Sequence, residues 1–191
     1  MTPYVYVRND RVLALPTAQS EKSPKPSYFD GIYWREGPAA PGFRHRDVLP
    51  ELVREAERFI QAQSAERPFL LYLPLTSPHT PWVPTDDFRG RTALGEYGDF
   101  VTQTDAAVGR VRKALQAAGL ADNSLLIFTS DNGAIPLPPE YRGSGHQPNG
   151  PWRGQKADCW EAGHRVPFLV HWPGQTPVGD TCAEPICHTD L

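Results

Sequence analysis

The sequence of 191 residues, 39% of them hydrophobic and 10% aromatic, is long enough to bury one substantial core. Its 19 basic and 22 acidic residues are mixed along the chain and leave a net charge of −3, so no field of one sign favours nucleic acid or an anionic membrane surface. No apolar run approaches the roughly 20 residues of a membrane-spanning helix, and the start, MTPYVYVRND, lacks the basic and apolar regions of a signal peptide. We therefore expect neither a nucleic-acid partner nor a membrane span.

The cysteine and proline content further limits the class of protein that the sequence can encode. Three cysteines, an odd number without a zinc-type C-x-x-C pair, argue against a disulfide framework and leave open one bridge, between Cys182 and Cys187. The 21 prolines are about twice the ordinary share, and aromatic residues are interleaved with them. Because disordered segments are poor in aromatic residues, this mixture predicts ordered loops packed on a scaffold.

In the first part of the chain, β-prone runs at 2–7 and 11–15, separated by a short turn, predict a hairpin. Residues 16–46 are rich in Pro, Gly and Ser without a period, and they predict a long surface loop that carries function or marks a missing partner. Apolar residues at helical spacing predict a helix over 48–63, with Asp47 as its N-cap.

The rest of the chain alternates between strand and helix patterns. Short apolar runs predict buried strands at 68–75, 125–130 and 166–173. The best helical pattern covers 99–118 and ends at Gly119, which suits the residue after a helix C-cap. This alternation predicts an α/β fold with a mainly parallel sheet flanked by helices.

Polar side chains follow two of the predicted strands, and in open α/β sheets ligands bind beyond the carboxyl ends of strands. Strand 68–75 is followed by His79, and strand 125–130 by Asp131-Asn132-Gly133. If the two strands are parallel neighbours, an imidazole, a carboxylate and an amide converge on one edge. Taken alone, a single histidine after a strand is more often an ordinary loop residue. Asp-Asn-Gly, taken alone, more often forms a turn than a ligand pair, because Asn and Gly accept positive φ.

A third segment, GPWRGQKADCWEAGHRVP, places Lys156 in a glycine-spaced loop. The ordinary interpretation is a solvated loop with an exposed lysine. The neighbouring Trp152 and Trp160, together with the small Gly154 and Gly163, favour a packed, shaped loop that leads into the last predicted strand.

The blocks PHTPW, TDAAVGRVRKAL, LLIFTSDNG and GPWRGQKADCWEAGHRVPFLVHWPG, in this order, resemble the later part of the catalytic domain of the type I sulfatases, in the alkaline-phosphatase-like superfamily. The set is far more specific than any one block. The match covers residues 66–191, whereas 1–65, with YFDGIYWREGPAAPGFRH, resemble a looser middle region of arylsulfatase-like bacterial members. The resemblance implies that residues 1–191 are a partial, incomplete sulfatase catalytic domain whose parent hydrolyses sulfate esters.

The resemblance also implies roles for four residues. Asp131 and Asn132 match a pair that ligates a divalent cation, usually Ca²⁺ with Mg²⁺ as the alternative; Ca²⁺ takes such oxygens at about 2.3–2.6 Å and would neutralise the charge of a bound sulfate ester. His79 matches a histidine that contacts the sulfate or the leaving oxygen and assists departure as an acid. Lys156 matches a lysine that binds the sulfate and stabilises charge on the leaving oxygen.

The segment after Lys156 departs from the family pattern. Glu161, Gly163 and Arg165 match the structural E-G-G-x-R-x-P loop of the family. Ala162 and His164 replace the more usual residues, so the geometry of this loop is expected to differ while Lys156 keeps its place.

The family's nucleophile is missing from these residues. Sulfatases convert the Cys or Ser of C/S-x-P/A-x-R to formylglycine, whose hydrate attacks sulfur; here the cysteines stand in CWEAG, CAEPI and CHTDL, and no serine fits. The paired acidic residues and the K-x-H segment of the family are missing too. We therefore interpret the chain as an internal piece of a sulfatase and expect no turnover by the chain alone. A sheet without its first strand exposes edges and apolar faces, so low solubility is also expected.

Other interpretations stay open. A phosphodiester or phosphonate monoester hydrolase of the same superfamily would be favoured by an unmodified Thr or Ser nucleophile upstream, and a non-catalytic remnant need not bind calcium through Asp131. Aryl esters, sulfated polysaccharides and small sulfated metabolites all fit as substrates, because specificity in the family resides in loops and a C-terminal subdomain. The resemblance implies a periplasmic or secreted parent.

Overall fold

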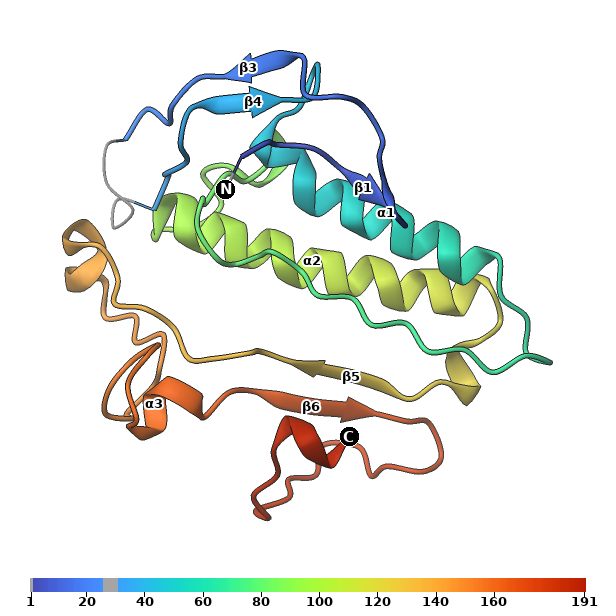
Figure 1. The fold of residues 1–191 in the computed structure, drawn as a ribbon. Coiled ribbons are helices and arrows are strands. Elements are labelled where there is room, and N and C mark those ends of the chain that lie inside the picture. The colour runs from blue at the N-terminus through green and yellow to red at the C-terminus, as the bar shows by residue number, and fades with distance from the viewer. Residues whose placement is uncertain (1, 26–30) are drawn as a thin grey trace.

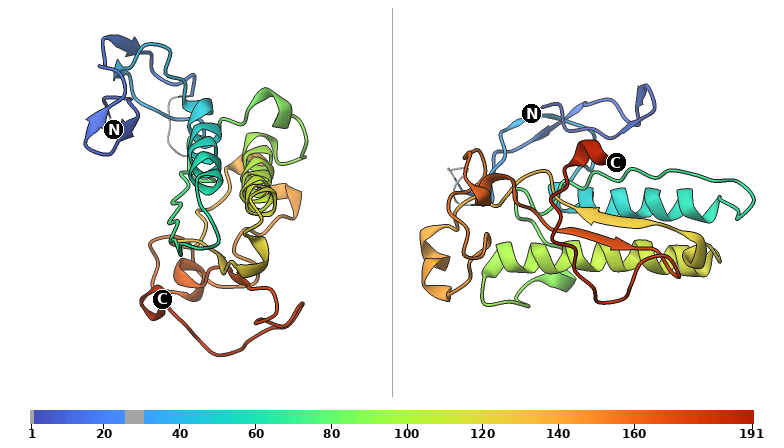
Figure 2. Two further views of the ribbon diagram at one scale, coloured as in Figure 1. Left: turned by 90° about the vertical axis from the view of Figure 1, so that its right-hand side faces the viewer. Right: turned by 90° about the horizontal axis from the view of Figure 1, so that it is seen from below.

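The computed structural model describes residues 2–25 and 31–191 (Figure 1). Its helices are α1 (Val48–Gln61), α2 (Gly95–Ala117) and the short α3 (Glu161–His164). Its strands are β1 (Val7–Arg8), β2 (Arg11–Val12), β3 (Ala18–Ser20), β4 (Gly37–Ala39), β5 (Leu126–Thr129) and β6 (Phe168–His171). The two long helices lie side by side, between the N-terminal strands on one side and β5 and β6 on the other (Figure 1 and Figure 2).

Helix α1 confirms the helical pattern over 48–63, and it buries the apolar stripe of that pattern. The residues buried from this helix are Leu49, Val53, Ala56 and Ile60. Asp47 is the N-cap residue, as predicted, but its side chain makes no capping hydrogen bond. Its carboxylate instead accepts a hydrogen bond from Arg44 Nε at 2.6 Å, because that guanidinium reaches it three residues away.

Helix α2 begins at Gly95, one turn before the predicted start at Asp99. Asp99 is 3% exposed, and its carboxylate accepts hydrogen bonds from the backbone N–H groups of Gly90 at 2.6 Å and Thr92 at 2.9 Å. A buried carboxylate inside the helix therefore anchors the preceding loop, and it does not start the helix. The predicted end is confirmed: Gly119 has φ +68°, and Leu120 N–H donates to the Leu115 carbonyl at 2.9 Å, as in a Schellman motif.

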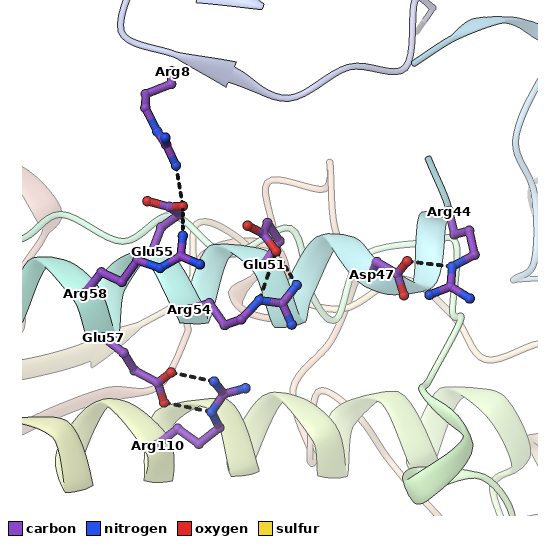
Figure 3. Close-up of polar contacts among 9 residues, drawn as sticks. All are labelled: Arg8, Arg44, Asp47, Glu51, Arg54, Glu55, Glu57, Arg58 and Arg110. Carbon is purple, nitrogen blue, oxygen red and sulfur yellow. Dashed lines mark hydrogen bonds and ion pairs between the residues drawn. The ribbon is translucent and has the colours of Figure 1, made fainter. Parts of the chain in front are cut away.

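The two long helices run in the same direction and pack against each other (Figure 1). Arg110 on α2 donates two hydrogen bonds to the carboxylate of Glu57 on α1, at 2.8 and 2.5 Å (Figure 3). Because this fork-to-fork pair is partly exposed, solvent screens much of its energy, and it serves mainly to set the register between the helices.

Residues 68–75 lie extended along the helices, with side chains alternating between two environments. Phe69, Leu71 and Leu73 pack on the core formed by α1 and α2, whereas Leu70 is 89% exposed and Tyr72 is 83% exposed. The period of two fits an extended conformation, but the prediction of a buried strand was wrong, because within the described residues this segment joins no ladder and one of its faces is exposed. Its outer face is therefore apolar and uncovered.

The third structural layer is the pair β5–β6. The ladder is antiparallel and runs from Leu126 opposite His171 to Thr129 opposite Phe168. The prediction of a buried strand at 166–173 was wrong in its burial, because three of the four β6 residues are exposed. The three ladders in the described residues are all antiparallel, so the expected mainly parallel pairing is not formed among them. Segment 68–75 and β5 nevertheless run in the same direction (Figure 1), with a long helix before each, as α/β folds arrange their strands.

The N-terminal region contains more structure than its composition predicts. The hairpin is confirmed in a shorter form, with Val7 paired to Val12 and Arg8 to Arg11. The prediction that 16–46 is only a loop was wrong, since β3 and β4 form a second antiparallel ladder there; residues 26–30 of this segment lie outside the described ones. Strands of three residues are too short to show a period.

An aromatic cluster ties this region to the start of α1. The ring of His45 stacks on Trp34 at 4.4 Å between centroids and meets Tyr4 edge-on at 4.6 Å. Burial among these rings lowers the pKa of His45 to about 4.

We expect neighbouring leucines of the extended segment to respond differently to truncation. Leu71→Ala removes a side chain from the helix-facing core and should lower the free energy of unfolding by about 2 kcal/mol. Leu70→Ala alters only the exposed face and should change it by less than about 0.5 kcal/mol while raising solubility. Urea unfolding of both variants measures the difference, and equal costs would contradict this orientation of the segment.

The structure also bears on the membrane-spanning helix and the disulfide bridge considered from the sequence. In the part of the chain that it covers, no helix combines the length and apolar character needed to cross a membrane. All three cysteines are free and exposed, so Cys182 and Cys187 form no bridge.

Candidate functional site

The turn after β5 carries the predicted ligand pair. Asp131 is exposed, and within the described residues its carboxylate makes no hydrogen bond or ion pair. Asn132 donates its side-chain N–H to the Gly133 carbonyl at 3.3 Å, and its backbone carbonyl accepts a hydrogen bond from Ser130 Oγ at 3.1 Å. These contacts leave the Asp131 carboxylate and the Asn132 side-chain oxygen available as two hard oxygen donors.

Gly133 is required here for a reason other than the predicted positive φ. Neither Asn132 nor Gly133 has a positive φ. A Cβ at Gly133 would instead lie 1.7 Å from the carbonyl oxygen of Ala162, because the turn presses against the loop that precedes β6. Gly163 is equally confined, since a Cβ there would lie 2.0 Å from the Asp158 carbonyl oxygen. Close packing selects glycine at both positions, between two loops at Gly133 and within the Lys156 loop at Gly163.

Backbone hydrogen bonds join this turn to the loop of Lys156. Gly133 N–H donates to the Gly163 carbonyl at 3.0 Å, and Lys156 N–H donates to the Ala134 carbonyl at 3.0 Å. The structure therefore brings Lys156 to the segment that follows Asp131 and Asn132, although 25 positions separate Lys156 from Asp131 in the sequence. Lys156 is half-buried, and none of the described carboxylates pairs with its ammonium group.

Two stacked Arg–Trp pairs shape the loop around Lys156. The Arg153 guanidinium lies 3.6 Å from the centroid of the Trp160 ring, and that of Arg165 lies 4.0 Å from the centroid of Trp152. These contacts order the loop, as predicted, although both rings stay partly exposed, Trp152 at 43% and Trp160 at 50%. The arginine partners were missed, because the sequence does not show which guanidinium covers which ring.

His79 approaches from a separate loop, after the extended segment. Its Nδ1–H donates to the Thr80 carbonyl at 2.7 Å, which fixes the orientation of the exposed ring. Buried Trp82 anchors this loop, because its indole N–H donates to the Pro78 carbonyl at 2.9 Å. Since 68–75 and β5 run in the same direction (Figure 1), their carboxyl ends face the same end of the molecule, where the Lys156 loop also begins.

The oxygen donors of Asp131 and Asn132 suit a hard cation, but they are only two. Carboxylate and amide oxygens are ligands that Ca²⁺ and Mg²⁺ take, whereas Zn²⁺ prefers nitrogen and sulfur. Among residues 2–25 and 31–191, no group of three or more His, Cys, Asp or Glu side chains could hold a metal ion. Asp131 and Asn132 fit a calcium ion as two of its six to eight oxygen ligands, and further ligands are needed for tight binding.

Comparison with known proteins defines the class. A family model described as Sulfatase matches residues 15–191, and the chain belongs to the sulfatase family. It is similar to an N-acetylgalactosamine-6-O-sulfatase of Bacteroides thetaiotaomicron, with 34% identity over 173 residues that make up 87% of this chain and 34% of the relative. A steryl-sulfatase of Mus musculus is 43% identical over 142 residues, 73% of this chain and 22% of the relative. The chain thus spans about a third or less of the length of these curated relatives.

Solved structures support the same class and confirm the fold class predicted from the sequence. A structure from a study of the metabolism of multiple glycosaminoglycans by Bacteroides thetaiotaomicron superposes with a TM-score of 0.73 at 28% identity, covering 90% of this chain and 42% of the other. The structure of Ps i-CgsB in complex with k-i-k-neocarrahexaose superposes with a TM-score of 0.58 at 33% identity, covering 69% of this chain and 29% of the other. The chain is an incomplete α/β domain of the alkaline-phosphatase-like sulfatase fold.

Proposed function

We propose that this chain supplies the metal-binding and sulfate-binding side of a sulfatase catalytic site. The observation that carries the proposal is the link between two loops: the turn with Asp131 and Asn132 is hydrogen-bonded to the loop with Lys156. Two oxygen donors and an ammonium group without an acidic partner then lie on joined segments at one end of the fold. Such a combination suits a tetrahedral anion bound to a hard cation.

Each side chain has a distinct task in this proposal. Asp131 and Asn132 hold Ca²⁺, or Mg²⁺ in its place, which when bound neutralises charge on the sulfate ester. Lys156 contacts a sulfate oxygen and the leaving oxygen, where negative charge grows as the S–O bond breaks. His79, whose ring is oriented by the bond from Nδ1–H to the Thr80 carbonyl, donates a proton to the leaving oxygen as a general acid.

The nucleophile must come from outside these residues. None of the cysteines or serines stands in a C/S-x-P/A-x-R context, so no formylglycine can form at such a motif in this sequence. Activity therefore requires further sulfatase segments, and the chain by itself provides binding groups without the attacking group.

The names of the relatives guide the choice of substrate class. They include sulfatases of N-acetylgalactosamine and of steryl esters, and one neighbouring structure holds an oligosaccharide. We propose a sulfate ester of a glycan or of a small molecule as the substrate.

An activity comparison tests the proposal. We expect no hydrolysis of p-nitrophenyl sulfate by the purified chain, because removal of a nucleophile costs many orders of magnitude in rate. A chimaera in which residues 15–191 replace the equivalent region of the Bacteroides N-acetylgalactosamine-6-O-sulfatase should hydrolyse sulfate esters. Turnover by the chain alone, or a folded chimaera that cleaves only phosphate esters, would contradict the proposal.

A further inference from the structure

We infer that Asn149 is a positioning residue that holds the Asp131–Asn132 turn against the Lys156 loop. The inference rests on the proposed function for its chemical meaning, but the contacts themselves stand without it. Asn149 belongs to none of the patterns that predict the site, since it lies in a proline- and glycine-rich stretch between β5 and α3.

The side chain of Asn149 pairs with both polar groups of one backbone residue. Ala134 N–H donates to Asn149 Oδ1 at 2.8 Å, and Asn149 Nδ2–H donates to the Ala134 carbonyl at 2.9 Å. The side-chain amide thus pairs with Ala134 as the backbone of an adjacent strand would, and it satisfies one donor and one acceptor. A carboxylate could accept from Ala134 N–H but would face the Ala134 carbonyl with a second acceptor, and alanine could do neither.

Ala134 is the junction between the two loops. Its carbonyl accepts a hydrogen bond from Lys156 N–H at 3.0 Å in addition to the one from Asn149. The preceding Gly133 leaves room for the amide, since a Cβ there would lie 3.2 Å from Asn149 Oδ1. One side chain therefore fixes the residue through which the ligand pair and the lysine are connected.

The anchor is itself held in place by a local turn. Gly150 N–H donates to the Gln147 carbonyl at 2.9 Å, and Trp152 N–H donates to the Asn149 carbonyl at 3.4 Å. The backbone of Asn149 is therefore already constrained, and its side chain is half-buried. Less conformational entropy is then lost when the Asn149 side chain bonds to Ala134. Loss of the amide should increase the mobility of Ala134 and weaken the hydrogen bond from Lys156 N–H. The turn with Asp131 and Asn132 and the loop with Lys156 should then both become less well positioned.

Hydrogen exchange on the 191-residue chain tests the link without requiring activity. In Asn149→Ala, protection of the Ala134 and Lys156 amides should fall by at least about tenfold, while amides of α1 and α2 keep theirs. Asn123→Ala is the matched control, because Asn123 is exposed in the turn after α2 and should leave both amides unchanged. Unchanged protection at Ala134 and Lys156 in Asn149→Ala overturns the inference.

A second variant keeps the test decisive if Asn149→Ala loses its structure. Asn149→Asp should show weak protection of the Ala134 amide at neutral pH, and this protection should rise relative to the parent chain on acidification, because a protonated carboxyl can donate to the Ala134 carbonyl. If the protection of the Ala134 amide in Asn149→Asp, divided by that in the parent chain, does not change with pH, the inference is overturned. A residue that only fills space would give no such profile.

Activity in the chimaera separates this inference from the proposed function. Asn149→Ala should lower kcat at least about tenfold, with partial recovery of Asn149→Asp at acidic pH. An unchanged kcat overturns the positioning role. An inactive parent chimaera counts against the proposed function, whereas the hydrogen-exchange result still decides the link.

Discussion

Replacing Lys156 by alanine in the chimaera should lower kcat for a sulfate ester by about 10²- to 10³-fold, the usual effect of removing one group that stabilises charge in a transition state. The cause is specific to the side chain: the backbone N–H of Lys156 would still bond to Ala134, so the loop should keep its place. The ammonium group has no carboxylate partner among the described residues, so its removal leaves no buried acid unpaired.

The matched control for this variant is Lys113→Ala. Lys113 is exposed on α2, so its removal changes the net charge equally and leaves the proposed site intact. We expect its kcat to match that of the parent chimaera. Equal activities of Lys156→Ala and Lys113→Ala, measured on folded proteins with circular dichroism as the check, would remove Lys156 from the site.

Replacing Asp131 by asparagine should lower sulfate-ester turnover in the chimaera by at least about 100-fold at micromolar calcium, because a ligand charge is lost while size and shape are kept. Asp131 is exposed and makes no hydrogen bond or ion pair within the described residues, so the change should cost little stability. Added calcium should restore part of the activity, since fewer ligands weaken binding without removing the site.

Asp105→Asn provides the comparison for Asp131→Asn. Asp105 is exposed on α2, well along the helix from its N-terminal end, and should show the calcium dependence of the parent chimaera. If both aspartate variants depend on calcium in the same way, the ion is not held by Asp131.

The elements that the sequence predicts well are those that local patterns determine. The stripe of α1 and the glycine after α2 each depend on residues within a turn or two, and both are confirmed. The start of α2 was misplaced by one turn, and Asp99, where the predicted helix begins, accepts hydrogen bonds from the backbone of Gly90 and Thr92. β4 was missed because Gly37 and Pro38 make up two of its three residues, and β3 because three residues are too few to show a period.

The pairing of strands and the coherence of the site depend on distant residues. Segment 68–75 has the alternation of a strand, yet a ladder also needs a partner, and none of the described residues provides one. The link from Asn149 to Ala134 spans 15 positions without periodicity, so no local signal predicts it. The ligand pair and Lys156 were predicted from their family resemblance, whereas their connection through Ala134 is visible only in the fold.

The most direct measurement is a calcium titration of the ¹⁵N-labelled 191-residue chain, followed by NMR. We expect saturable shifts at the amides of residues 130–134 and of Lys156, with a dissociation constant on the order of 10⁻³ M because few ligands are present. Asp131→Asn should abolish these shifts, and Asp105→Asn should retain them. The absence of any shift at these amides in the parent chain, or identical shifts in Asp131→Asn, would contradict the assignment of the turn as part of a sulfatase metal site.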